Sequence, residues 1–596
     1  MAKLRNEMQS EFTWNLADLF ASDEAWENKL SETKEYINKI TAYSGHLSDN
    51  AKTLLDFLKL QDELSVNMDK LGNYAYRKSD EDTRNSVYQQ MKNKYSAVAV
   101  EINQAFAFEI PELLSIDEEK LQGFYKELNK LEHYRLMLDR IRRQKEHILS
   151  KECEEILAAT GMLRQAPDEI FSMLNDADMT FNDAIDADGN KHPVTHGSFV
   201  PLLQSPDRQL RKSAFEALYG EYRKFRNTSA AILNSQMQQL KFMANMRKYN
   251  SPLEASLDDT EVPTSIYHNL IKTVHENLSS MHDYVALRKK LLDLDELHFY
   301  DMYTPIIPDE DFKISYDEAK AITLEALKPL GDDYISMLKE GFDNRWIDVY
   351  ENTGKRSGAY SASAYGVHPY VLLNYTDTLD DVFTLVHEMG HALHSYLSNK
   401  NQTSTYASYV IFVAEVASTC NEALLMQYLL SKTSDNKKRA YLINHFLEQF
   451  RGTLYRQTMF AEFELWCSEK VKNGEALTAD ALDEKYAVLN KQYYGEEIHL
   501  DNEIALEWAR IPHFYYDFYV YQYATGFSAA IALSQRILKE GKPAVDDYLK
   551  FLSGGCSSDP VSLLKIAGID MNSSEPINNA LKLFKALTDE LNTLCK

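Results

Sequence analysis

The chain has 596 residues with 90 acidic and 64 basic side chains, which gives a formal net charge of −26. Glycine (21) and proline (15) together make 36 of the 596 residues, about half of the usual share of about 12%. This composition excludes collagen-like repeats and intrinsic disorder, and it argues against a fold of many hairpins. It also argues against nucleic acid and anionic membranes as partners, because both require basic surfaces. We expect a mainly α-helical protein.

The five cysteines are scattered, odd in number and without a CxxC pair. This pattern predicts free thiols in a reducing compartment and argues against a thiolate metal cluster. The N-terminal residues lack an apolar signal core, and no run approaches 18 apolar residues. The sequence therefore predicts a cytoplasmic protein; it does not indicate an oligomeric state.

Helical periodicity dominates residues 26–130, where apolar side chains recur at helical spacing between charges. The pattern first breaks at residues 179–200, where Asp186-Ala-Asp-Gly-Asn separates two β-prone runs, the second of which covers residues 196–200. We expect a β-hairpin around this Asp-Gly turn. An EF-hand loop is disfavoured, because Gly189 at its sixth position would put Ala184 at the first.

The pattern breaks again at residues 352–376, which contain three glycines and the β-prone run 367–375. Pro369 lies inside this run, so we expect an edge strand. An edge strand can pair with an extended peptide by β-augmentation. Gly366, Val367 and His368 are therefore candidate substrate-binding residues, with Gly366 allowing close approach of a backbone. Alternatively, Gly366 only begins the strand.

The next segment contains the strongest motif in the chain. Hydroxyl and acidic residues at 376–381 are typical of a helix start, and His387-Glu-Met-Gly-His391 follows on the same predicted helix. Histidines at i and i+4 leave one helix face and can share a zinc ion, while Glu388 can act on a zinc-bound water without being a ligand. Chance would give about 0.04 HExxH motifs in a chain of this composition.

A third ligand must come from farther along the chain. The extended zinc motif requires glycine and histidine where this chain has His394 and Leu397. No acidic residue lies between positions 392 and 414, and the first one is Glu415, in an otherwise apolar stretch. A lone carboxylate there is costly to bury unless it is paired or metal-bound. Glu415 is therefore the predicted third ligand, and Glu422 is a candidate hydrogen-bond acceptor for a ligand histidine.

Tyrosines concentrate in the segment 513–526. On a helix, Tyr516, Tyr519 and Tyr523 would share a face, and His513 would extend it by one turn. Phenol and imidazole groups can donate hydrogen bonds to the oxyanion of a tetrahedral intermediate. An aromatic stripe at helical spacing is also typical of a core, and the residues alone leave this alternative open.

The motif and its spacing to Glu415 resemble the M3 (thimet oligopeptidase-like) metallopeptidases, in particular their bacterial oligoendopeptidase F branch. Supporting segments span nearly the whole chain: residues 12–20, 355–360, 493–495, 554–560 and 567–570. The resemblance implies a two-lobed helical fold with a deep substrate channel and a small β-sheet beside the zinc helix. The expected domains are an N-terminal helical domain, 1–200, and a catalytic domain, 201–596.

The resemblance also implies one Zn²⁺ held by His387, His391 and Glu415, and endopeptidase activity on oligopeptides. It supports catalytic roles for His513 and Tyr523. Tyr516, as a catalytic residue, and Tyr519, as a substrate contact, are alternatives for the remaining tyrosine position of the family's site. Val520 is at the position where a middle tyrosine of the family could fall. The alternatives are a helical HExxH carboxypeptidase and a zinc-free, peptide-binding scaffold.

Overall fold

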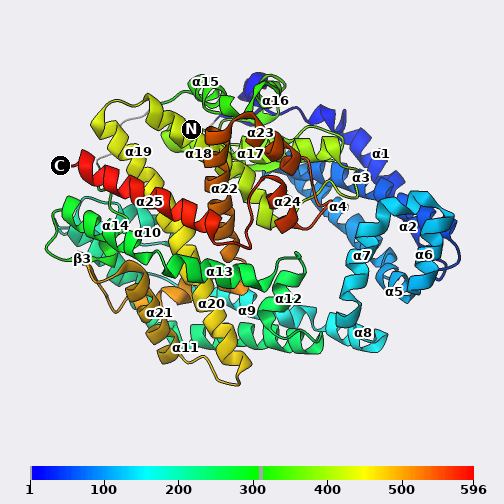
Figure 1. Ribbon diagram of the computed structural model, residues 1–596, viewed down its shortest axis with the longest axis horizontal. Coiled ribbons are helices and arrows are strands. Elements are labelled where there is room, and N and C mark those ends of the chain that lie inside the picture. The colour runs from blue at the N-terminus through cyan, green and yellow to red at the C-terminus, as the bar shows by residue number, and fades with distance from the viewer. Residues whose placement is uncertain (1–2, 308–312) are drawn as a thin grey trace. The chain divides into compact units, whose positions relative to one another are not determined.

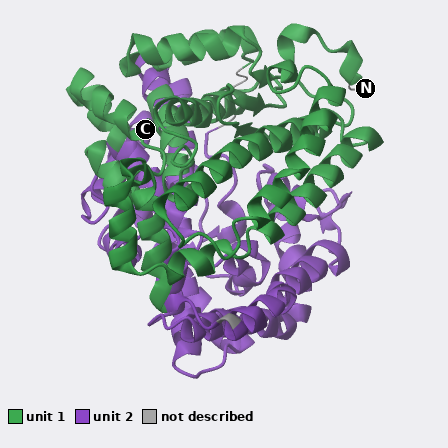
Figure 2. Ribbon diagram, turned by 90° about the vertical axis from the view of Figure 1, so that its right-hand side faces the viewer, with its two compact units in different colours: residues 1–146, 312–425, 533–568 green, residues 147–311, 426–532, 569–596 purple. Residues whose placement is uncertain are grey.

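The computed structural model describes residues 3–307 and 313–596. The chain forms two compact units, and each unit is assembled from three separate segments (Figure 2). Unit 1 contains residues 1–146, 312–425 and 533–568, and unit 2 contains residues 147–311, 426–532 and 569–596. Helices dominate both units (Figure 1), which confirms the mainly α-helical prediction. The expected domain boundary at residue 200 coincides with none of these segment ends and stays a prediction.

Unit 1 contains a helical N-terminal part and a group of helices around a small sheet. Its helices are α1 (Asp23–Lys34), α2 (Tyr36–Thr41), α3 (Ala51–Glu81), α4 (Ser86–Ala105), α5 (Glu109–Ser115), α6 (Glu118–Glu127), α7 (Arg135–Arg143), α15 (Tyr316–Ala326), α16 (Asp332–Asp343), α17 (Leu379–Asn401), α23 (Lys542–Leu552) and α24 (Pro560–Ile566).

The longest of these helices, α3, shows why the N-terminal part is helical. It begins at Asn50, whose side chain accepts a hydrogen bond from the N–H of Thr53 at 3.0 Å and so satisfies a free donor of the first turn. Its buried face includes Leu54, Leu58 and Leu71, which belong to one hydrophobic core with residues of α1 and α4. The helical periodicity predicted for residues 26–130 is thus confirmed.

The sheet of unit 1 has three short strands in the order β4 (Ile347–Asp348), β6 (Tyr370–Leu372), β5 (Tyr360–Ala362). β6 pairs with β4 in parallel and with β5 antiparallel. The prediction of an edge strand at 367–375 is therefore wrong: β6 is central. Pro369 lies just before the strand, where its missing N–H interrupts no ladder bond, and a free edge belongs to β5.

A buried ion pair anchors the end of β4. The ammonium group of Lys355 lies 2.7 Å from Oδ1 of Asp348, and both side chains are almost completely buried. Lys355 also donates hydrogen bonds to the backbone oxygens of Asp348 and Tyr350. Burial lowers the pKa of Lys355, opposed by the charge of Asp348. The segment 355–360, which contributes to the family resemblance, thus supports the sheet.

Unit 2 contains the helices α8 (Lys151–Ala159), α9 (Gly161–Ser172), α10 (His196–Leu203), α11 (Arg208–Met246), α12 (Pro252–Asp258), α13 (Thr264–His275), α14 (Leu278–Leu291), α19 (Asn436–Gln449), α20 (Arg456–Lys472), α21 (Ala479–Tyr494) and α25 (Glu575–Leu594). Two further helices, α18 (Ile411–Lys432) and α22 (Tyr521–Glu540), have residues in both units. Among the helices of residues 3–307 and 313–596, none is both long and apolar enough to cross a membrane.

The predicted hairpin of unit 2 is present but shorter than expected. β1 (Ala184–Ile185) pairs antiparallel with β2 (Lys191–His192) around the Asp-Gly turn, and Gly189 has a φ of 85°. The β-strand expected at residues 196–200 is instead the start of α10. Thr195 and Ser198 form a capping box at its N-terminus, and this local capping outweighs the β-propensity of the segment.

Candidate metal centre

The zinc motif lies on α17 (Figure 1), which packs beside β5 and β6 in unit 1. The helix begins at Thr378, whose hydroxyl accepts from the N–H of Asp381 while the Asp381 carboxylate accepts from the N–H of Thr378. The sequence predicted a helix start at these hydroxyl and acidic residues. His387 and His391 lie one turn apart on the same face, and their Nε2 atoms are 3.1 Å apart.

The third carboxylate comes from α18. Oε2 of Glu415 lies 3.4 Å from Nε2 of His387 and 3.5 Å from Nε2 of His391. Three ligands of a tetrahedral zinc site, each about 2.1 Å from the ion, are about 3.4 Å from one another. The three atoms are thus spaced as one ion requires, and the donor set of two imidazoles and one carboxylate fits zinc.

Glu422, on the same helix, orients one of the imidazoles. Its Oε1 lies 2.5 Å from Nδ1 of His387; the sequence made it a candidate for this contact and left an ordinary polar role open. A carboxylate that accepts from Nδ1–H fixes the tautomer and the ring plane, so that Nε2 carries the lone pair toward a metal. Glu388 is not part of this ligand group; its side chain is buried beside it, and its Oε2 has no hydrogen-bond partner within the described chain.

The charges of the site favour a cation. Burial alone would lower the pKa of His387, but the hydrogen bond and charge of Glu422 and the charges of Glu388 and Glu415 raise it to about 9. Burial raises the pKa of Glu388, although the two histidines partly oppose this. Three carboxylates around two imidazoles therefore stabilise added positive charge.

The spacing of α17 and α18 depends on Gly390, the glycine inside the HExxH motif. A Cβ atom at this position would lie 2.6 Å from Cα of Ser418 and 3.0 Å from the backbone oxygen of Ala417. The missing side chain thus allows the two helices that carry the ligands to approach backbone to backbone. In the sequence, this close approach of the two helices is indicated by a glycine inside the HExxH motif.

Several predicted substrate residues do not belong to a strand. Gly366 lies in a turn with a φ of 77°, and residues 367 and 368 follow it as irregular backbone before β6. The ring of His368 stacks on Trp346 at 5.3 Å, and its Nε2 lies 3.1 Å from Asp18. His368 therefore has packing and hydrogen-bonding partners of its own within unit 1.

The tyrosine segment, in unit 2, forms a cluster but not the expected single helix. Residues 512–515 form a short 3₁₀ helix, and α22 begins only at Tyr521. Between them, Asp517 and Phe518 have φ values of 52° and 63°, a left-handed backbone that breaks a helix. The prediction of a shared helix face is therefore wrong.

The four candidate side chains are nevertheless neighbours. The phenol of Tyr523 lies 3.3 Å from Nε2 of His513, and the ring of Tyr519 packs against both of their rings. Tyr516 lies against His513 and is half exposed. Burial and the charge of Arg456 lower the pKa of His513, which favours the neutral form of its imidazole.

The unusual turn is held by a buried carboxyl group that the sequence analysis missed. Oε1 of Glu464, on α20, accepts a hydrogen bond from the N–H of Phe518 at 2.7 Å. Gln236 donates to Oδ1 of Asp517 at 2.9 Å. Glu464 is completely buried, but Glu462 lies two residues before it, so it is not a lone carboxylate in an apolar stretch as Glu415 is.

This carboxyl group predicts a specific pH dependence of stability. Burial, with the charge of Asp517, raises the pKa of Glu464 from 4.5 to about 8. Between these values the folded state keeps a proton that the unfolded state has lost, so the free energy of unfolding falls as pH rises from 4.5 to 8 and then levels off. Glutamine at position 464 has no such proton to lose, so Glu464→Gln should not show this decrease in the free energy of unfolding. We expect the variant to exceed the wild type in urea-unfolding stability at pH 8 but not at pH 5.

A neighbouring carboxylate supplies the control. Burial would raise the pKa of Glu462, but His275 and Lys485 lower it. The contribution of Glu462 to the free energy of unfolding is present above the pKa that it has in the unfolded state, and it is lost as pH falls. Glu462→Gln should therefore be less stable than the wild type at neutral pH. An unchanged pH profile in Glu464→Gln would show that Glu464 does not retain its proton.

The two histidines, the non-ligand glutamate beside them and the carboxylate from the next helix are the arrangement of an HExxH metallopeptidase. The family model described as Peptidase family M3 matches residues 201–583, and the one described as Oligopeptidase F matches residues 112–181. The chain belongs to peptidase family M3.

Individual relatives agree with this assignment over nearly the full length. The chain is 48% identical to "Oligopeptidase PepF" of Bacillus subtilis, with 99% of this chain and 88% of the relative covered. It is 39% identical to "Group B oligopeptidase PepB" of Streptococcus agalactiae, with 100% and 99% covered. A crystal structure of oligoendopeptidase-F from Enterococcus faecium, 36% identical, matches with a TM-score of 0.75 and covers 96% of this chain and 99% of that one.

Proposed function

We propose that the protein is a zinc-dependent endopeptidase that hydrolyses internal bonds of short peptides in the cytoplasm. One observation carries the proposal: Nε2 of His387, Nε2 of His391 and Oε2 of Glu415 lie 3.1, 3.4 and 3.5 Å from one another. The names of the relatives support oligopeptides as the substrates. The five free cysteines support a reducing compartment.

When bound by His387, His391 and Glu415, zinc supplies Lewis acidity, which polarises a carbonyl group and lowers the pKa of water. Glu388 acts as the general base and then as the general acid. The water oxygen bonds to the scissile carbonyl carbon while Glu388 takes its proton. Glu388 then delivers this proton to the amide nitrogen as the C–N bond breaks. Its raised pKa suits a group that must accept and release a proton near neutral pH.

The edge of β5 offers a backbone template for the substrate. The N–H groups of Val371 and Leu373 donate to backbone oxygens of residues 346 and 348, on the side of β4. Val371 is therefore in a non-hydrogen-bonded pair with Ser361, so the N–H and C=O of Ser361 face away from β6. An extended peptide can pair with them whatever its side chains. A cavity of about 850 Å³ in unit 1 adjoins this edge, with Ser361 and Ser363 in its lining.

For His513 and Tyr523 we propose hydrogen bonding to the oxyanion of the tetrahedral intermediate. Their mutual contact at 3.3 Å and the neutral imidazole support this role. Tyr516 and Tyr519 are proposed as neighbouring contacts of the peptide.

The phenol of Tyr523 can be tested by removing one oxygen atom. Loss of an oxyanion donor costs about 10²–10³ in kcat, so Tyr523→Phe should lower kcat by about 10²-fold with little change in KM. Tyr428→Phe, on α18, removes a phenol whose ring faces Lys432 and should leave kcat unchanged. Equal kcat values in wild type and Tyr523→Phe would remove Tyr523 from the mechanism.

The activity itself is tested with an internally quenched peptide that is blocked at both ends. We expect cleavage at an internal bond, loss of cleavage with a chelator, and recovery on addition of zinc. A carboxypeptidase would leave this blocked peptide intact and would cleave only a version of it with a free C-terminus. A zinc-free scaffold would show neither hydrolysis nor bound metal.

A further inference from the structure

A second group of histidines and carboxylates lies in unit 2, on the two-stranded sheet of β3 (Leu297–His298) and β7 (Ile498–His499). The strands are parallel, and His298 is directly opposite His499. Paired residues point to the same face of a sheet, and the centres of the two imidazole rings are 4.8 Å apart.

One carboxylate reaches both imidazoles. Oε2 of Glu296 lies 3.3 Å from Nε2 of His298, and Oε1 of Glu296 lies 3.1 Å from Nδ1 of His499. The carboxylate of Asp501 also belongs to the group, because it offers an oxygen within 4.8 Å of a nitrogen of each histidine. The group therefore contains two nitrogen donors and two carboxylates.

Asp501 fixes the orientation of one ring. Its Oδ1 lies 2.8 Å from Nδ1 of His298, and its Oδ2 accepts a hydrogen bond from the N–H of Phe299 at 3.1 Å. With Nδ1–H donated to Asp501, Nε2 of His298 presents a lone pair toward Glu296. Two acceptors at 3.3 Å repel each other unless a proton or a cation lies between them.

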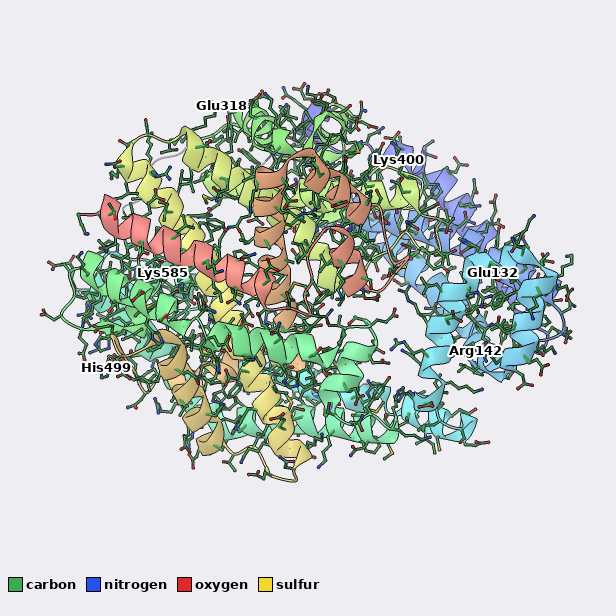
Figure 3. All side chains as sticks on the ribbon, viewed as in Figure 1. Glu132, Arg142, Glu318, Lys400, His499 and Lys585 are labelled. Carbon is green, nitrogen blue, oxygen red and sulfur yellow. The ribbon has the colours of Figure 1, made fainter. Side chains whose placement is uncertain are left out.

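The same arrangement occurs at the metal centre on α17. There, Glu422 binds Nδ1 of His387, and Nε2 of that ring faces Glu415 at 3.4 Å. In both places one carboxylate orients an imidazole and another carboxylate lies at the spacing of a shared ligand sphere. The second group is partly enclosed, since the side chain of His298 is 16% exposed, whereas that of His499 is 50% exposed and lies at the surface (Figure 3).

We propose that His298, His499 and the two carboxylates beside them, Asp501 and Glu296, form a second divalent-metal site, in which His298, His499 and Asp501 offer donor atoms within 4.8 Å of one another. Imidazole with carboxylate suits zinc and related transition metals rather than calcium or magnesium. The site joins two chain segments about 200 residues apart, which are otherwise paired over two residues only. Its role is therefore to stabilise unit 2, separately from peptide hydrolysis.

The stoichiometry of zinc binding tests this proposal. The full chain is freed of metal with a chelator, zinc is added, and bound zinc is measured by titration calorimetry and by elemental analysis after dialysis. We expect two zinc ions per wild-type chain, and one in each of His499→Ala and Glu415→Gln. His499→Ala should hydrolyse peptides at the wild-type rate, because it keeps the first site.

Thermal unfolding gives a second readout that does not depend on activity. In the Glu415→Gln background, zinc should raise Tm, and the added substitution His499→Ala should abolish this rise without changing Tm in the absence of metal. His46→Ala is the matched control, because His46 forms an exposed pair with Asp49 at 2.8 Å, as His499 does with Glu296 at 3.1 Å. We expect it to keep both zinc ions. The proposal would be overturned by a stoichiometry of one zinc ion per wild-type chain. It would also be overturned if His46→Ala and His499→Ala lost the same amount of bound zinc.

Discussion

Replacing Glu388 with glutamine is expected to leave the protein folded and metal-loaded while lowering kcat by about 10³-fold, within the range of general-base catalysis. Glutamine keeps the size of the side chain but cannot take a proton from water. The three ligand side chains are unchanged, so the metal content should match that of the wild type. Steady-state kinetics and elemental analysis on the same preparation measure both quantities.

Glu132→Gln is a suitable control for this substitution. Glu132 is exposed and pairs with Arg135 (Figure 3), so the same chemical change there should leave kcat unchanged. If Glu388→Gln retains its metal and most of its activity, another group is the base. If it loses its metal, Glu388 supports metal binding rather than proton transfer.

The second large effect is expected from Gly390→Ala. In an open helix, alanine is more stable than glycine by about 1 kcal/mol. At Gly390, however, the added Cβ would meet the backbone of Ser418 at 2.6 Å, and overpacking of this kind costs about 1–3 kcal/mol. Because a backbone cannot move aside as a flexible side chain does, α18 must shift and take Glu415 with it.

A shift of α18 weakens the metal site as well as the fold. Metal–ligand distances tolerate only about 0.2 Å, so we expect zinc affinity to fall by at least about 10-fold, measured by competition with a coloured chelator. Gly123→Ala on α6 is the control, since no atom lies within 4 Å of its added Cβ; it should be slightly more stable than the wild type. Unchanged zinc affinity in Gly390→Ala would show that the helices tolerate the extra carbon.

The metal centre could be predicted from the sequence because its information is local. The i and i+4 spacing puts two imidazoles on one helix face, and Glu415 is the first acidic residue after the motif, in an otherwise apolar stretch. The geometry of the site then depends on one close contact, at Gly390. No pattern of apolar and polar residues encodes that contact, although the glycine itself is visible in the motif.

The two wrong predictions, for β6 and for the tyrosine segment, have a common physical origin in long-range contacts. β6 is central because it pairs with β4, a strand of two residues too short to have a periodic signal. The tyrosine segment is broken because Glu464 and Gln236, on other helices, hold Asp517 and Phe518 in a left-handed conformation. Local helical spacing cannot reveal partners that lie 50 to 280 residues away.

The division of each unit into three segments also has a consequence for biosynthesis. Unit 1 includes residues 533–568, and within it Asn401 and Gln402, at the end of α17, form hydrogen bonds to Ser553. A ribosome releases a chain from the N-terminus, and domains fold as they are completed. The helix with the two histidines therefore emerges more than 150 residues before part of its own support. Metal capture by the nascent chain must precede complete packing of this helix or wait until residues 533–568 have been synthesised.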